Sequence, residues 1–332
     1  PLSDEIRRKI ALFTNVEIDG VIEARDVETI YEVPLSLKKQ RLDDVIAERL
    51  GLDLPQPDMT SWTAMVNRVK HPSAGTAKIA VVGKYTDHID SYKSIQESLI
   101  HGGIANDVKA DIHWLSSEVF DNGEGVEKLK EYDGLLIPGG FGPRGVEGML
   151  ETIRWARENQ MPFFGICLGL QCAVIEFARN VCGLEGSHSS EFAEASPDPV
   201  ICLLDSQLQV TTMGGTMRLG AYPCALGEGT KAREIYGVDE ISERHRHRFE
   251  VNNEYRDLLT DNGMTISGTS PDGGLVEMIE LTEHPWFVAG QFHPELKSRP
   301  TRPHPLFASF VGAAAAYARN QPAKPAAEPA SV

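Results

Sequence analysis

The sequence of 332 residues lacks several features that would place it in other classes of protein. No apolar run approaches the roughly 20 residues of a membrane span, and no signal-peptide pattern opens the chain. Basic residues are outnumbered, and the net charge of −16 argues against non-specific binding to DNA or RNA. Anionic ligands would need local basic clusters instead. With 41% hydrophobic residues, the chain can still bury the cores of two domains.

Cysteine is scarce, and its pattern excludes two kinds of scaffold. The five cysteines are odd in number and none forms a C-x-x-C pair, so neither a disulfide framework nor a zinc site is indicated. We therefore expect a reducing, cytoplasmic setting. The cysteines are Cys167, Cys172, Cys182, Cys202 and Cys224.

The first part of the chain predicts a small domain followed by a linker. Residues 9–16 read as a short buried strand, and residues 35–50 as an amphipathic helix that Gly51 ends. Stretches with proline and glycine mark a boundary near residues 52–77. Because the chain opens with Pro1 inside this pattern, we expect it to be part of a longer protein. The expected division is 1–55 for a partial first domain, 56–77 for a linker, 78–319 for a second domain and 320–332 for a disordered tail.

From residue 78 onward, strand-like and helix-like segments alternate. This order predicts an α/β fold, with an open, mostly parallel sheet and helices on both faces. One helix is expected over 90–103, with Asp90 as its N-cap and Gly102 as its stop. Later segments are mostly strand-like and closely spaced, and residues 305–319 predict a closing helix. Those strand-like segments are 208–213, 247–252, 264–268, 275–280 and 286–292.

Cys167 lies where the apolar strand over 161–166 meets the next helix, with Gly165 and Gly169 on either side. The spacing G-x-C-x-G resembles a nucleophile elbow, a sharp strand-to-helix turn that presents a reactive side chain. The helix dipole would also stabilise a thiolate at this position. The alternative is a small buried side chain in a sheet with glycines nearby.

A cysteine nucleophile needs a base and a group that orients the base. His293 and Glu295 stand two residues apart on an extended segment, so both point the same way and can complete a Cys-His-Glu triad. The backbone N–H groups of Gly140 and Leu168 could form an oxyanion hole. For the segment 136–145, a plain glycine-rich turn or a phosphate loop are the alternatives, although the G-x4-G-K pattern is absent.

The motifs P-G-G-F-G, G-x-C-x-G-x-Q and F-H-P-E, in this order, resemble the class I glutamine amidotransferases, whose domain is flavodoxin-like. Four stretches resemble the CTP synthase family more narrowly, and residues 1–60 resemble the end of that family's synthetase domain. The four stretches are IPGGFGPRGVEGM, GICLGLQ, RHRHRFEVNN and HPWFVAGQFHPE.

The resemblance implies roles for individual residues around a glutamine substrate. Cys167 would be the nucleophile, His293 the acid and base, and Glu295 the group that orients the histidine. Glu191 would hold the substrate's α-amino group and Arg248 its other polar end, which suits a zwitterion. An exposed basic strand or a metal-binding histidine cluster are the alternatives for RHRHR. The glutamine site would be completed by Gly140, Leu168, Gly169, Leu170 and Gln171.

The resemblance also implies nucleotides and an assembly. Lys9 would contact UTP or CTP, Arg25, Asp26 and Val27 would contact ATP, and Arg144 and Glu147 would belong to a lid activated by GTP. The family's Mg²⁺ ligands and phosphate loop belong to a preceding segment that this sequence does not contain, and the family forms homotetramers. The expected activity of the whole protein is therefore that of an ATP-dependent carbon–nitrogen ligase in pyrimidine nucleotide synthesis. By itself, this chain is expected to perform only the glutamine hydrolysis. A γ-glutamyl hydrolase, another class I amidotransferase and a non-catalytic nucleotide-binding assembly module are the alternatives.

Overall fold

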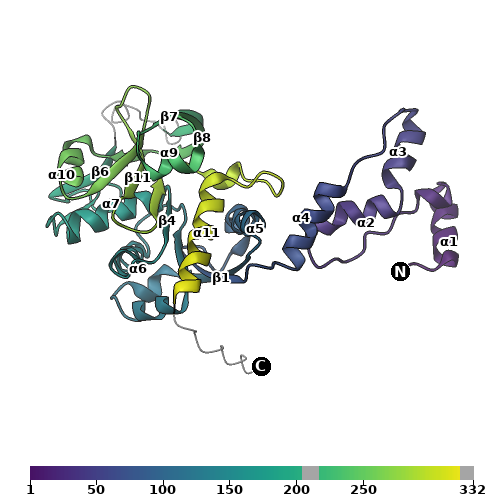
Figure 1. Cartoon of the computed structure of the whole chain (residues 1–332), viewed down its shortest axis with the longest axis horizontal. Helices are drawn as coiled ribbons and strands as arrows, with labels where there is room; N and C mark the ends of the chain where they lie inside the picture. The colour runs from purple at the N-terminus through teal and green to yellow at the C-terminus, as the bar shows by residue number, and fades with distance from the viewer. Residues whose placement is uncertain (204–216, 322–332) are drawn as a thin grey trace. The chain divides into compact units, whose positions relative to one another are not determined.

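The computed structural model describes residues 1–203 and 217–321, and the chain divides into two compact units, Pro1–Ser73 and Ala74–Val332. Figure 1 shows the helices and strands of both units. The expected strand 208–213 and the expected tail lie mostly or wholly outside the described residues. Each unit is described by itself below.

The first unit contains helices and no strands, which departs from the mixed α/β character expected for it. Its buried side chains include Ala11, Val21, Tyr31, Met65 and Val66. The elements are α1 (Asp4–Thr14), η1 (Ile18–Gly20), η2 (Ile30–Glu32), α2 (Val33–Lys39), α3 (Leu42–Leu50) and α4 (Thr60–Lys70). Helix α4 therefore lies within the range expected to be a linker.

The strand predicted over 9–16 is wrong, because these residues mostly belong to α1. The Ser3 side chain caps the helix by accepting a hydrogen bond from the N–H of Ile6, and acidic residues occupy the first turn. The apolar run predicts a buried segment, but Leu12 and Phe13 are 78% and 77% exposed in the described structure. The prediction is wrong because it rests on the apolar content of these residues and not on the helical spacing of their apolar side chains.

The single helix predicted over 35–50 is two helices, α2 and α3. Arg41 adopts a left-handed conformation with φ 60°, which ends the first helix before the second begins. The side-chain oxygen of Gln40 accepts from the N–H of Glu23 at 2.7 Å, and its side-chain nitrogen donates to the carbonyl oxygen of Glu23 at 2.9 Å. A tertiary contact therefore holds the break between the two helices. Gly51 does end α3, with φ 64°.

Within residues 74–203 and 217–321, the second unit is built on a nine-stranded sheet in the order β2-β1-β3-β4-β12-β11-β10-β7-β8. The strands from β2 to β12 run parallel, and those from β12 to β8 pair antiparallel. A small sheet β5-β6-β9 lies apart. The strands are β1 (Thr76–Gly83), β2 (Lys109–Ser116), β3 (Gly134–Ile137), β4 (Phe163–Ile166), β5 (Ser187–Ser189), β6 (Asp198–Leu203), β7 (Arg218–Leu226), β8 (Glu240–His247), β9 (Phe249–Val251), β10 (Met264–Thr269), β11 (Val276–Leu281) and β12 (Phe287–Gly290).

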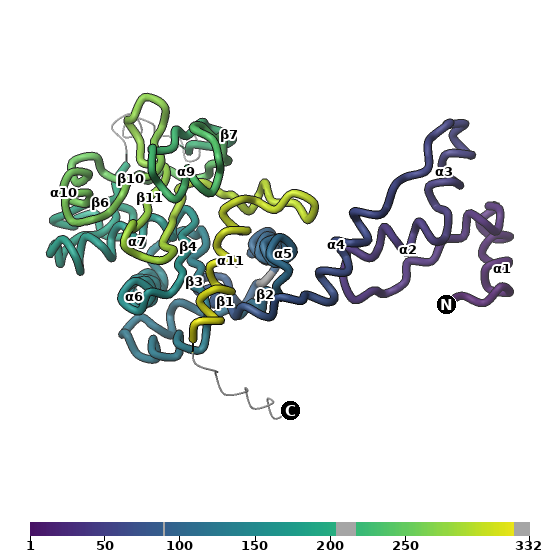
Figure 2. Tube along the Cα trace, viewed as in Figure 1, coloured from purple at the N-terminus to yellow at the C-terminus, as the bar shows by residue number. Residues whose placement is uncertain are grey.

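Helices cover both faces of this sheet, as predicted. On one face, Ile79 and Val81 of β1 pack in a core with side chains of α5 (Lys93–Asn106) and α11 (Pro305–Asn320), two helices that lie side by side (Figures 1 and 2). On the other face, Ala80 and Val82 share a core with α6 (Val146–Glu158) and α7 (Leu168–Asn180). Alternation along one buried strand thus supplies both cores. The remaining helical elements are η3 (Ile89–Tyr92), η4 (Ser117–Phe120), η5 (Val126–Glu131), α9 (Lys231–Tyr236), η6 (Asn253–Tyr255), α10 (Arg256–Asp261) and η7 (Pro294–Leu296).

The predicted ends of the helix over 90–103 are both wrong. Residues 89–92 form η3, so α5 begins at Lys93 and Asp90 does not cap it. The helix continues past Gly102 to Asn106 and ends at Asp107, which has φ 55°. A Cβ on Gly102 would lie 2.6 Å from the carbonyl oxygen of Phe307, so this glycine permits close packing against α11.

Candidate active site

The turn at Cys167 is a strained strand-to-helix junction. Cys167 lies between β4 and α7 with φ 54° and ψ −99°, a conformation that side-chain-bearing residues rarely adopt. Its N–H donates to the carbonyl oxygen of Gly290 at 2.8 Å, which ties the turn to β12. A Cβ on Gly165 would meet the backbone of Gly169 at 2.8 Å, and one on Gly169 would meet the carbonyl oxygen of Ile137 at 2.3 Å. The two glycines are therefore required by the closeness of the chain.

His293 and Glu295 follow β12, the strand that runs parallel to β4 with Gly290 opposite Ile166. Neighbouring parallel strands end at the same edge of the sheet, which brings residues 126 positions apart in sequence together. The Nδ1 atom of His293 lies 2.7 Å from Oε1 of Glu295, and its Nε2 atom has no hydrogen-bond partner among the described residues. A Cβ on Gly139 would lie 2.8 Å from the ring of His293 and 3.6 Å from Cβ of Cys167. Gly139 therefore lies next to both residues.

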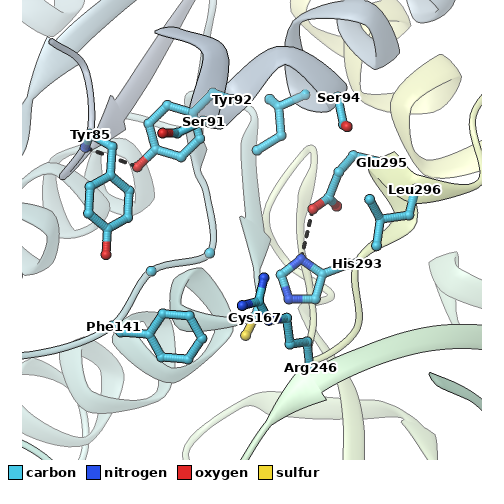
Figure 3. A pocket seen from close by; sticks show the side chains of 13 residues that line it. Tyr85, Ser91, Tyr92, Ser94, Phe141, Cys167, Arg246, His293, Glu295 and Leu296 are labelled. Atoms are coloured by element: carbon cyan, nitrogen blue, oxygen red, sulfur yellow. Dashed lines mark hydrogen bonds and ion pairs between the residues drawn. The ribbon is translucent and has the colours of Figure 1, made fainter. Parts of the chain in front are cut away.

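A first cavity of about 340 Å³ opens in front of these groups. Figure 3 shows the sulfur of Cys167 and the ring of His293 facing it, with the hydrogen bond from His293 to Glu295. Burial disfavours the charged ring, but the Cys167 thiolate and the Glu295 carboxylate outweigh burial and raise the pKa of His293 to about 11. The surroundings of His293 thus favour its charged imidazolium form.

A second cavity, of about 260 Å³, also reaches Cys167. Two of the residues expected to bind glutamine line this cavity, the acidic Glu191 and the basic Arg248. Gly140 and Gln171 line it as well, whereas Leu168, Gly169 and Leu170 are buried in the first turn of α7. In the described structure, Oε1 of Glu191 also accepts a hydrogen bond from the N–H of Gly142 at 3.2 Å.

The RHRHR segment forms β8 and its end, and its two residue types face opposite ways. His245 and His247 are buried, whereas Arg244 and Arg246 are exposed. Nε2 of His247 lies 2.7 Å from the buried carboxylate of Glu250. Among the residues that the structure describes, no group of three or more His, Cys, Asp and Glu side chains could hold a metal ion.

Lys84 is a buried residue beside the site that the sequence prediction missed. It follows β1 and is only 4% exposed, and its ammonium group donates to the carbonyl oxygens of Phe141 and Gly142. Its side chain also passes 3.4 Å from where a Cβ on Gly140 would lie. Burial lowers the pKa of Lys84. Its place at the carboxyl end of a parallel strand was the available signal.

Arg144 and Glu147, expected in a lid, each pair with other residues. Arg144 donates to the carbonyl oxygen of Lys84 at 2.5 Å and lies 3.3 Å from Glu118. Glu147 lies 2.7 Å from Arg179 of α7, and hydrogen bonds from His188 and Arg179 lower the pKa of Glu147 to about 2. Arg144 therefore contacts the loop beside the site, while Glu147 ties α6 to α7.

The residues expected to contact UTP, CTP and ATP lie in the first unit. Lys9 is exposed on α1, and Asp26 and Val27 follow Arg25 in a segment without regular secondary structure. Arg25 forms an ion pair with the buried Glu23. The other four cysteines are free, as is Cys167.

Comparison with known proteins identifies the class to which this site belongs. Residues 87–313 match the family described as glutamine amidotransferase class-I, and the chain belongs to that family. More narrowly, it is similar to the CTP synthases: residues 1–52 match the family described as CTP synthase N-terminus. CTP synthases from Clostridium perfringens and Carboxydothermus hydrogenoformans are 55% and 56% identical over 94% of the chain. The chain spans 58% of the length of these two relatives.

A solved structure supports the same placement. The glutaminase domain of Trypanosoma brucei CTPS, with bound acivicin, has a TM-score of 0.69 and 38% sequence identity to this chain. The match covers 72% of this chain and 94% of that domain. The predicted resemblance to glutamine amidotransferases and CTP synthases is thereby confirmed, as is the predicted fold of an open, mostly parallel sheet. No helix in the described ranges is long and apolar enough to cross a membrane.

Proposed function

We propose that this chain hydrolyses glutamine at Cys167 and is the ammonia-producing part of an enzyme that aminates UTP to CTP. The observation that carries the proposal is the meeting of a strained cysteine turn with a hydrogen-bonded His293–Glu295 pair at one cavity. The similarity to CTP synthases supports the nucleotide part, since the matches include both the amidotransferase family and residues 1–52.

The first half of the reaction uses the charged pair. The Cys167 thiolate attacks the side-chain amide carbon of glutamine, and the backbone N–H groups of Gly140 and Leu168 receive the developing oxyanion. Leu168 is the first residue of α7, so its N–H has no acceptor within the helix. The His293 imidazolium gives its proton to the nitrogen as the C–N bond breaks, and ammonia leaves a thioester.

The second half restores the charged pair. Neutral His293 takes a proton from water as the water oxygen attacks the thioester carbonyl. The C–S bond then breaks, releasing glutamate and returning Cys167 to the thiolate. Throughout, the Glu295 carboxylate accepts from Nδ1 of His293, so Nε2 stays directed at the reacting atoms.

The second cavity suits the amino acid end of glutamine. Glu191 and Arg248 both line it, and opposite charges can pair with the α-ammonium and α-carboxylate groups of a zwitterion. A cavity of about 260 Å³ that also reaches Cys167 leaves the side-chain amide at the nucleophile. We therefore assign substrate selection to these two side chains.

The nucleotide chemistry belongs to the whole protein. Lys9 would contact UTP or CTP, Arg25, Asp26 and Val27 would contact ATP, and Arg144 and Glu147 would respond to GTP as an activator. Among the described residues no group of His, Cys, Asp and Glu side chains could hold a metal ion, so these residues do not fit Mg²⁺. A cytoplasmic homotetramer is part of the same proposal, and the five free cysteines are consistent with a reducing compartment.

Substitution of the nucleophile tests the glutaminase proposal. We expect Cys167→Ala to abolish both glutamate release and labelling by a glutamine-mimicking electrophile such as acivicin. Cys182→Ala is the matched control, because Cys182 is a half-buried thiol away from both cavities, and it should retain labelling. Labelling or glutamate release that survives in Cys167→Ala would overturn the assignment. Mass spectrometry of the labelled peptide identifies the modified cysteine.

A further inference from the structure

Gln291 lies beside the nucleophile and has no role in the reaction proposed above. It is the first residue after β12 and is completely buried. Its N–H donates to the carbonyl oxygen of Glu277 at 2.8 Å, which holds its backbone against β11. The preceding Gly290 pairs with Ile166 and accepts from the N–H of Cys167. Parallel register therefore places Gln291 and Cys167 at matching ends of adjacent strands.

The side chain of Gln291 directs an N–H at the nucleophile. Its Nε2 atom donates to the sulfur of Cys167 at 3.7 Å. Its Oε1 atom accepts from Nε2 of Gln171 at 3.4 Å. Gln171 in turn donates from the same nitrogen to the carbonyl oxygen of Phe249 at 3.0 Å.

This chain of amides has only one self-consistent orientation. A backbone carbonyl can only accept, so the carbonyl of Phe249 requires the nitrogen of Gln171 to face it. The same nitrogen then requires the oxygen of Gln291, which leaves the nitrogen of Gln291 for the sulfur. A sulfur that receives an N–H is favoured as the thiolate, because an anionic acceptor makes the stronger hydrogen bond.

We propose that Gln291 is a hydrogen-bond donor to the Cys167 thiolate, held in that orientation by Gln171 and the carbonyl of Phe249. The proposal rests on the glutaminase reaction assigned above and adds a group to it. In the resting enzyme the N–H supports the thiolate alongside His293. When the thioester breaks down, sulfur leaves as a thiolate again, and the same N–H is already in place to receive the charge.

Other titratable groups also surround the sulfur. Cys172 lies on α7, five residues after Cys167, and burial raises the pKa of its thiol to about 12. The charged or titratable residues that line the two cavities are Tyr85, Tyr92, Glu191, Arg246, His247, Arg248, His293 and Glu295. All of these groups remain when Gln291 is replaced. A change in the pKa of the Cys167 thiol in such a variant is therefore due to the loss of the Gln291 amide.

The test measures the pKa of Cys167 directly. Gln291→Met keeps a long side chain of similar volume and removes the N–H. The rate of Cys167 alkylation by iodoacetamide is followed against pH in the whole chain, with the alkylated peptide identified by mass spectrometry. We expect the midpoint to rise by about one pH unit, which is a roughly tenfold lower ratio of thiolate to thiol at any given pH. The buried change Met278→Leu, on the strand beside Gly290, is the control and should leave the midpoint unchanged.

A second variant separates the hydrogen bond from packing. Gln291→Glu preserves the shape and turns an oxygen toward the sulfur, so the midpoint should rise at least as far as in Gln291→Met. An unchanged midpoint in both folded variants would overturn the proposal and leave Gln291 a packing residue. Alkylation needs no glutamine, so the measurement stands whether or not the chain turns glutamine over. Absence of glutamate release in the unaltered chain would contradict the proposed function alone.

Discussion

At the scale of single residues, the site depends on one unfavourable backbone conformation. Cys167 has φ 54°, and a side chain in such a conformation costs of the order of 1–3 kcal/mol. The hydrogen bond to Gly290 and the tight approach of Gly165 and Gly169 hold it there. The strain has a use, because it lifts the sulfur out of the strand and toward both cavities.

The protonation of His293 depends on its neighbour. The thiolate of Cys167 and the carboxylate of Glu295 together overcome the burial that would keep the ring neutral. The pKa of about 11 in the folded protein exceeds the ordinary value of 6.5. The imidazolium therefore adds stability that is complete below pH 6.5 and is lost as the pH rises toward 11.

Removing the thiol should lower the pKa of His293. In Cys167→Ala, burial opposes the charge of the ring and only Glu295 remains to favour it. We expect the ring titration, followed by NMR, to move to a lower pH. Urea unfolding between about pH 6 and pH 10 should also show a smaller loss of stability in this variant. An unmoved titration would mean that the thiolate does not act on the ring.

At the scale of elements, a buried ion pair joins α6 and α7, the two helices on one face of the sheet. Arg157 of α6 makes hydrogen bonds of 2.7 to 3.2 Å with the carboxylate of Glu176 on α7. The side chain of Glu176 is fully buried, and Asn180 donates to it as well. Because α7 starts directly after Cys167, this pair braces the helix that follows the nucleophile.

Two arginines on α6 provide a matched test of this brace. Arg157→Met leaves the Glu176 carboxylate buried without its partner, so we expect the free energy of unfolding to fall by about 3 kcal/mol. Arg154→Met removes an exposed pair with Glu158 and should change it by less than about 1 kcal/mol. Denaturant unfolding of both variants gives the comparison. Equal losses would show that burial of Glu176 does not matter.

At the scale of the whole molecule, the candidate active site belongs to one compact unit. Every residue lining the two cavities falls between Tyr85 and Leu296, within the unit that begins at Ala74. That unit has its own nine-stranded sheet and a core on each face. The residues expected to contact UTP, CTP and ATP lie in the other unit.

A shortened chain tests this independence. Residues 74–332 expressed alone should fold and should react with the glutamine-mimicking electrophile at Cys167 at a rate within about twofold of the whole chain, because all the lining groups are retained. Mass spectrometry with time measures the rate. Loss of labelling in a folded product would show that the first unit takes part in forming the site.

Local sequence was enough to predict the turn at Cys167, the His293–Glu295 pair and the parallel half of the sheet. Each depends on short-range rules: glycines that allow a tight turn, a two-residue period on an extended segment, and alternating strands and helices. Local sequence failed at α1, where an apolar run proved to be an exposed helix, and at Gly102, which packs against α11 instead of ending α5.

Only the tertiary structure decided which distant groups meet. Lys84 reaches the carbonyls of the loop at Phe141, Arg144 and Glu147 bond to different partners, and Gln291 faces the sulfur. These contacts follow from the order and register of β1, β3, β4 and β12, whose ends converge although the residues are far apart in sequence. Turn and period are properties of neighbouring residues, whereas the partner of a side chain depends on which strands the folded sheet sets side by side.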